Sequence, residues 1–126
     1  MKIEASEKRY ESETNKDGAY YSTHYIGVDN EQDTSLAFIG WMSSGLRVWD
    51  IRDPYDPKEI GYYIPGAKPN AKLPGVDLYP NKNVDYVYSF IRYRPETGHI
   101  WFAGVYNGFM IAELENNPLR PKSPSH

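Results

Sequence analysis

A strand-turn-strand pattern occurs twice in this chain, at residues 36–51 and again at residues 100–114. Three pairs of residues mark the repeat once one residue is deleted at the turn: Gly40 with Gly104, Gly45 with Gly108, and Ile51 with Leu114. A short unit of strands that recurs in this way is typical of architectures built from similar stacked sheets. The repeat therefore predicts an all-β fold and excludes a helical bundle.

The first unit is predicted to form four antiparallel strands, and the second unit three. The first set covers residues 20–29, 34–42, 46–51 and 59–64, and the second covers residues 85–93, 99–105 and 109–114. Gly45 and the pair Asn107-Gly108 occupy tight turns, where glycine tolerates a positive φ. Four antiparallel strands in this order form one blade of a β-propeller, so we predict about two propeller-like blades.

The remaining segments are rich in polar residues or proline. Residues 1–18 are predicted to be a flexible N-terminal extension, and residues 115–126, which contain three prolines, a flexible C-terminal tail. The blade units are expected at residues 19–65 and 84–114. The proline-rich residues 66–83 are expected to link them, and linkers of this length are often functional or interfacial.

Composition excludes several classes of protein. At 126 residues the chain is expected to form one domain, and it has no cysteine, which rules out disulfides, cysteine-ligated zinc and thiol catalysis. A net charge of −3 does not suit nucleic-acid binding. No apolar run has the length of a membrane span, and the first residues lack a signal peptide, so a cytoplasmic location is the default expectation although the compartment stays open.

Several segments resemble the LVIVD-repeat family of β-propellers, specifically its C-terminal part. They are Ser22-Thr23-His24-Tyr25, Val28-Asp29, residues 45–54, residues 57–63, residues 90–101 and Asn107-Gly108-Phe109. The resemblance covers roughly residues 20–114 and implies a fold and a repeat pattern, but no activity. Family members supply a whole ring, in which the N-terminal end provides the fourth strand of the last blade.

A chain with only two blades exposes the faces that neighbouring blades normally cover. Such faces are apolar and adhesive. We therefore expect a homo-oligomer, for example three copies in a six-bladed ring, or association with a larger partner subunit. The N-terminal extension is a candidate for the missing edge strand. The leading functional expectation is a non-enzymatic binding or scaffolding subunit that completes a β-propeller in this way.

His24, Tyr25 and Asp29 are the candidate catalytic residues of an alternative reading. If their strand is the innermost one, His24 faces a central channel and acts as a general base on a small organic or anionic substrate. The competing interpretation is a structural histidine that is hydrogen-bonded between strands. A metal site made by His24 and His99 has no supporting spacing, so we expect neither a metal nor a cofactor.

Four further residues are candidate ligand-binding residues. Arg92 and Arg94 share one face of a strand and suit an anionic ligand, with a solvated face as the competing interpretation. Trp41 and Tyr106 are candidates for an apolar pocket at an assembly seam, with a place in the core as the alternative.

Overall fold

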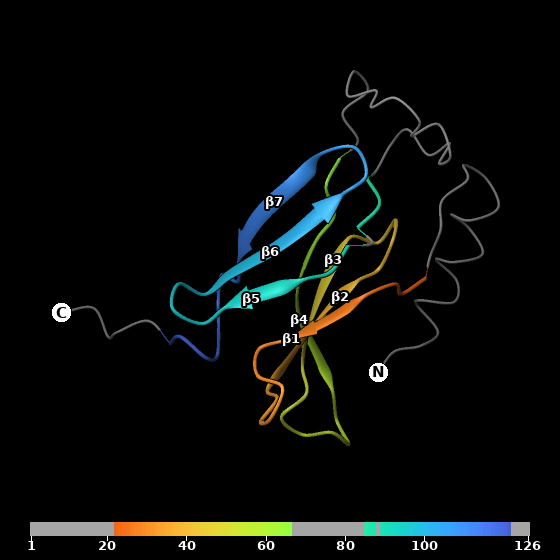
Figure 1. Ribbon diagram of the computed structural model, residues 1–126. Helices are drawn as coiled ribbons and strands as arrows, with labels where there is room; N and C mark the ends of the chain where they lie inside the picture. The colour runs from red at the N-terminus through yellow and green to blue at the C-terminus, as the bar shows by residue number, and fades with distance from the viewer. Residues whose placement is uncertain (1–21, 67–84, 88, 122–126) are drawn as a thin grey trace.

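The computed structural model describes residues 22–66, 85–87 and 89–121, and these residues form two antiparallel β-sheets (Figure 1). No helix occurs in this part of the chain. The all-β prediction is therefore confirmed. The predicted extension at residues 1–18 and the linker beyond residue 66 lie outside the described residues.

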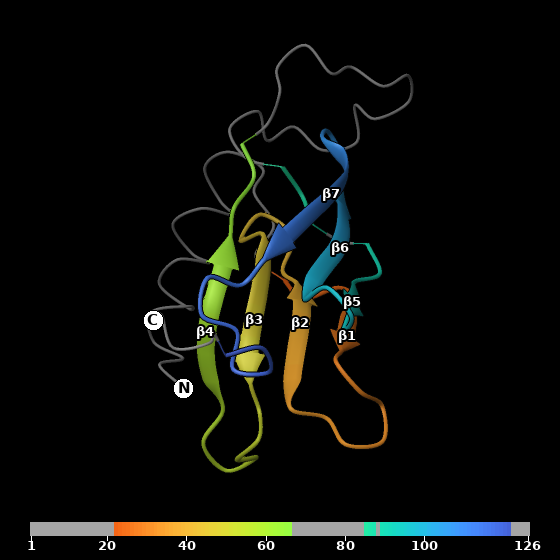
Figure 2. The ribbon, with the colours of Figure 1, turned by 90° about the vertical axis from the view of Figure 1, so that its left-hand side faces the viewer.

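The first sheet has four strands that follow one another in chain order, as predicted. They are β1 (Ile26–Val28), β2 (Leu36–Gly40), β3 (Leu46–Asp50) and β4 (Lys58–Tyr63). Figure 2 shows them side by side, with the second sheet in front of them. Gly45 has a φ of 76°, so the turn between β2 and β3 uses glycine as predicted.

The second sheet has three strands, and they also follow chain order. They are β5 (Arg92–Arg94), β6 (His99–Gly104) and β7 (Gly108–Glu113). Gly108 has a φ of 70° in the predicted Asn-Gly hairpin. The first strand is shorter than the predicted span of residues 85–93, because Val87 forms only an isolated bridge to Gly104 of β6 and a second bridge to Met42 in the β2–β3 turn.

Residues 85–87, which we call the strap, join the two sheets through backbone hydrogen bonds. Val87 exchanges two of these bonds with Met42 in the first sheet, at 3.0 Å and 3.1 Å. The N–H of Val105, beyond β6, donates to the carbonyl oxygen of Tyr86 at 3.1 Å. Tyr86 and Val87 are both buried. One short segment therefore fixes the position of each sheet relative to the other.

The core lies between the inner faces of the two sheets. Leu36, Phe38, Leu46 and Val48 come from the first sheet, and Val87, Ile91, Tyr93, Ile100 and Phe102 come from the second sheet and the strap. The rings of Phe38 and Tyr93 stack at 5.2 Å. Each large apolar side chain buried here contributes roughly 1.5–3 kcal/mol to the free energy of unfolding.

The described part of the C-terminal segment packs against the second sheet. Leu119 contacts the core, and the side-chain amide of Asn117 donates to the Tyr93 hydroxyl at 3.0 Å. Arg120 donates to the carbonyl oxygen of Pro95 at 2.9 Å. Residues 115–121 therefore do not form the flexible tail that was expected. Leu119 packs against the core and Asn117 donates a hydrogen bond to Tyr93, so this polar stretch is held against the second sheet.

The pairing of strands aligns the two units without a deletion. Gly40 pairs with Leu46, and Ala103 pairs with Phe109, so residues 41–45 and residues 104–108 fill equivalent turns. The positive-φ glycines Gly45 and Gly108 then coincide. The equivalent of Gly40 is accordingly Ala103. The alignment of Gly40 with Gly104 expected above is wrong by one residue, because the shared glycines do not occupy the same position on their strands.

We predict that Gly27→Ala destabilises the fold. A methyl group at Gly27 would overlap the carbonyl oxygen of Ile91, where β1 lies against the start of β5. We expect a loss of about 1–3 kcal/mol in the free energy of unfolding, measured by urea denaturation. Gly66→Ala is the matched control, since its methyl group would meet no atom within 4 Å. Equal stabilities for the two variants would contradict the close contact of β1 with β5.

Candidate functional site

The face of the second sheet that points away from the first sheet carries large side chains. We call it the outer face. Its members alternate along the three strands and the residues before β5: Phe90, Arg92, Arg94, Trp101, Phe109 and Ile111. Phe90, Phe109 and Ile111 are 61%, 64% and 53% exposed. A contiguous apolar patch of this kind commonly marks an interaction surface.

Equivalent positions in the first sheet are buried. Phe109 corresponds to Leu46 and Ile111 to Val48, which are only 2% and 1% exposed. Leu46 and Val48, which the second sheet covers, therefore correspond to the exposed Phe109 and Ile111 of the second unit.

Backbone hydrogen bonds explain why equivalent side chains differ in burial. The N–H of Gly40 points to β1, where it donates to the carbonyl oxygen of Tyr25 at 2.9 Å. The N–H and C=O of its equivalent, Ala103, also point to the preceding segment, where both contact the Ser89 hydroxyl. The two hairpins thus have the same hand, and their equivalent side chains lie on equivalent faces. The first sheet packs with one of these faces, and the second sheet packs with the opposite one.

Aromatic and charged groups are interleaved over the outer face. The Arg94 guanidinium lies over the Trp101 ring at 4.9 Å and also pairs with Glu96. The Trp101 ring meets the Phe109 ring edge-on at 5.7 Å. The pKa of Glu96 is lowered, first by its own backbone N–H and then by the hydrogen bond from Arg94. The carboxylate therefore stays ionised, and Arg94 stays over the tryptophan.

Three of the candidate residues gather at the β5 edge of the outer face. The His24 ring lies edge-on to Tyr25 at 4.6 Å, and Tyr25 contacts Phe90 at 5.3 Å. The Arg92 guanidinium lies over the Phe90 ring, 5.8 Å from its centroid. Phe90 therefore contacts both Tyr25 and Arg92, and His24 joins this group through its neighbour Tyr25. The catalytic assignment stays a prediction.

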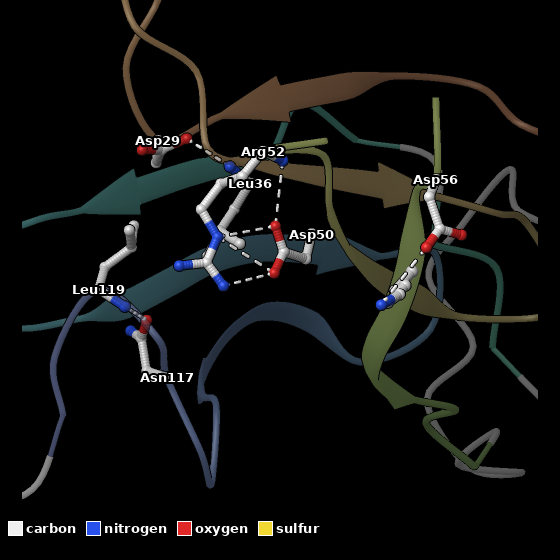
Figure 3. Close-up of polar contacts among 8 residues, drawn as sticks. Asp29, Leu36, Asp50, Arg52, Asp56, Asn117 and Leu119 are labelled. Atoms are coloured by element: carbon white, nitrogen blue, oxygen red, sulfur yellow. Dashed lines mark hydrogen bonds and ion pairs between the residues drawn. The ribbon is translucent and has the colours of Figure 1, made fainter. Parts of the chain in front are cut away.

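Asp29 lies at the far end of β1 from His24 and has a structural role. Its Oδ1 atom accepts the backbone N–H groups of Ser35 at 2.8 Å and Leu36 at 2.7 Å, which begins β2 (Figure 3). A carboxylate that accepts two backbone N–H groups closes the turn between β1 and β2.

A second carboxylate orders the corner after β3. Asp50 accepts hydrogen bonds from the Arg52 side chain, the shortest at 2.7 Å (Figure 3). These bonds hold the pKa of Asp50 below its usual range. The Asp50–Arg52 pair therefore stabilises the fold at pH values above the pKa that Asp50 has in the unfolded chain. This stabilisation is lost as the pH falls through the lowered pKa that Asp50 has in the folded chain.

Trp41 and Tyr106 lie in the two hairpin turns that the strap joins. The Trp41 ring stacks on Trp49 at 6.5 Å, and the backbone N–H of Tyr106 donates to Asp85 at 2.8 Å. Binding of a ligand by either residue remains a prediction.

Asp85 was missed by sequence reasoning, although it organises the second turn. Its fully buried carboxylate accepts the backbone N–H groups of Tyr86, Tyr106 and Asn107, and also the Asn107 side-chain amide. The carboxylate lies directly against Gly104, where a methyl group would overlap it. The partners Tyr106 and Asn107 lie far away in the sequence, so no local motif marks this residue.

We predict that Asp85→Ala lowers the free energy of unfolding by at least about 2 kcal/mol, because it leaves several buried N–H groups without an acceptor. Urea denaturation is the measurement. Asp53→Ala is the matched control, since Asp53 accepts a backbone N–H in an exposed turn and its loss should cost within about 0.5 kcal/mol. If Asp85→Ala lowered the free energy of unfolding as little as the control does, the role of the Asp85 carboxylate as a buried acceptor would be contradicted.

Comparisons with known proteins do not identify the chain. No family model matches it, and no curated protein matches it either. Within the described ranges there is no cluster of three metal-ligating side chains, and no helix that is long and apolar enough to cross a membrane.

Proposed function

We propose that the protein is a non-enzymatic assembly subunit that associates with further copies of itself through the outer face of the second sheet. Each copy adds two sheets to a growing stack, and three copies close a propeller-like ring of six, as the family resemblance suggests. The subunit then serves to build a binding platform.

The observation that carries this proposal is the use of opposite faces in the contact between the two sheets. This contact joins different faces of similar units and leaves the outer face of the second sheet exposed, and repetition of such a contact builds a ring or a filament. Phe109 and Ile111 occupy the free positions that correspond to the buried Leu46 and Val48. The outer face is thus related by the repeat to a surface that already accepts a sheet.

The sequence of the second unit supports the same reading. Residues 109–112 and residues 100–103 are uninterrupted apolar runs, which are typical of strands covered on both faces. In the part of the chain that the structure describes, the sheet of β1 to β4 covers one face of β6 and β7, and Phe109 and Ile111 on the other face are exposed. A second sheet on the outer face would bury the other half of each run.

Side-chain sizes at the proposed contact are also compatible. Inside the chain Phe38 stacks on Tyr93. Between copies, the repeat places Trp101 in the position of Phe38 and Val28 in the position of Tyr93. A side chain larger than Phe38 therefore meets one smaller than Tyr93. The Arg47 guanidinium donates through Nε to Ser44 and through Nη1 to Glu59, whereas its buried Nη2 has no hydrogen-bond partner; its alkyl stem lies in the position of Met110.

A second candidate function is an enzyme subunit that uses His24 on a small organic or anionic substrate at a seam. It is favoured by the grouping of His24, Tyr25 and Arg92 around Phe90. Asp29 takes no part in it, because its carboxylate is engaged by backbone N–H groups. Loss of ligand binding in His24→Ala with unchanged assembly would favour this candidate, and lost assembly would indicate a structural histidine.

We predict that Phe109→Glu dissociates the assembly to monomers, because a carboxylate at the centre of the contact would lose its hydration. Native mass spectrometry and light scattering measure the molecular mass over a range of concentrations. Tyr55→Glu is the matched control, since Tyr55 is 96% exposed in a turn of the first sheet and should leave the mass unchanged. A wild-type chain that stays monomeric with intact β-sheet circular dichroism would contradict the proposal.

A further inference from the structure

The free edge of β7 is equivalent to an edge that is occupied in the first sheet. In the first sheet β4 pairs along β3, where Leu46 is opposite Tyr63 and Val48 is opposite Gly61. In the second sheet β7 is the last strand. Among the described residues, no strand pairs with β7 at the place where the first unit has its fourth strand.

Along this edge, the backbone of β7 presents groups that no strand within residues 22–66, 85–87 and 89–121 pairs with. Ala103 points its N–H and C=O towards Ser89, so Phe102 and its partner Met110 point theirs towards each other. Phe109 and Ile111 alternate with Met110, and their N–H and C=O groups accordingly point away from β6. An edge of this kind is a template for the addition of another strand.

A groove runs beside the C-terminal end of β7, where the added strand would pass. Its volume is about 630 Å³, and it is lined by residues 59–63 of β4, by Arg47 and by residues 112–116. Figure 2 shows β7 running obliquely in front of β3 towards β4. Tyr63 and Leu114 supply apolar surface, so the groove has a floor for side chains as well as a backbone edge.

The groove carries an excess of negative charge. Glu59, Glu113 and Glu115 line it, against the single guanidinium of Arg47. Arg47 is already paired with Glu59 at 2.8 Å. Glu113 is paired with His99 at 2.7 Å, so Glu115, which is on an exposed residue, is the carboxylate that favours a basic side chain in the occupant.

We propose that this edge and groove bind an extended segment of a partner polypeptide, which runs antiparallel to β7 and becomes the fourth strand of the second sheet. The pattern of β4 defines its chemistry: an aromatic residue opposite Phe109, a small residue opposite Ile111, and a basic residue opposite Ala112, where β4 itself has Glu59. The segment is recognised by its backbone, its apolar side chains and its positive charge. This inference goes beyond the proposed self-association, because it uses the edge of the sheet and not its outer face.

The probe is a fluorescein-labelled peptide with the sequence of residues 57–64 and lysine in place of Glu59: Pro-Lys-Lys-Ile-Gly-Tyr-Tyr-Ile. Fluorescence anisotropy measures its binding to the full chain. We expect saturable binding that is about three- to tenfold tighter than that of the same peptide with glutamate, and that weakens at high salt. An absence of saturable binding, or tighter binding of the glutamate peptide, would overturn the proposal.

Backbone recognition is tested with matched peptides. A methyl group on the glycine nitrogen removes an N–H that faces β7, and should abolish binding. The same group on the nitrogen of the first tyrosine removes an N–H that faces away, and should be tolerated. Equal binding of the two peptides would contradict strand addition.

A matched pair of protein variants completes the test. Ile111→Pro removes an outward N–H that the ladder with β6 does not use, so the fold should persist while peptide binding is lost. Ile111→Thr keeps the N–H and should bind. Peptide binding retained by folded Ile111→Pro would overturn the proposal, and the methylated peptides decide the question if that variant does not fold. A monomeric chain that binds the peptide would contradict self-association and support this inference, so the two proposals fail separately.

Discussion

The arrangement of the two sheets depends on the strap at residues 85–87. Val87 is hydrogen-bonded to Met42 in the first sheet, Tyr86 to Val105, and Asp85 to the turn of the β6–β7 hairpin. These groups are buried, so each lost bond would leave a desolvated donor or acceptor. The strap therefore holds the two hairpin turns together, while the close approach of β1 and β5 fixes a second point of contact.

These two constraints explain why the sheets use different faces. Both hairpins have the same hand, and the chain enters each of them through its first strand. The second hairpin therefore lies across the first in the same orientation and is not turned over. Phe38 then faces the second sheet, whereas its equivalent Trp101 faces away from the first. A unit built this way has a covered face at one side and an open one at the other. The outer face and the free edge of β7 both follow from that asymmetry.

The elements with local signals could be predicted from the sequence. The order of the strands, the glycine turn at Gly45 and the hairpin at Asn107-Gly108 are each encoded within a few residues, and the structure has all of them. The strap could not be predicted, because Asp85 and Val87 have the composition of a strand and their partners lie on other elements. Their burial depends on tertiary contacts and not on periodicity.

The candidate site was predictable in part for the same reason. His24, Tyr25 and Arg92 were singled out by residue type, but their meeting depends on Phe90, which the sequence presents as one more aromatic in an apolar strand. An aspartate such as Asp29 is common both among catalytic residues and in turns. The hydrogen bonds from the Ser35 and Leu36 N–H groups to its carboxylate assign it to the turn, and the sequence does not show them.

The most direct test of opposite-face packing is amide hydrogen exchange measured by NMR on the full chain. The direction of an N–H group in a strand is coupled to the face of its side chain, so protection reports the register. Leu46 and Val48 should be protected by β4, and Met110 and Ala112 by β6, while Phe109 and Ile111 exchange quickly. Protection of Phe109 and Ile111 with rapid exchange at Met110 and Ala112 would contradict the account.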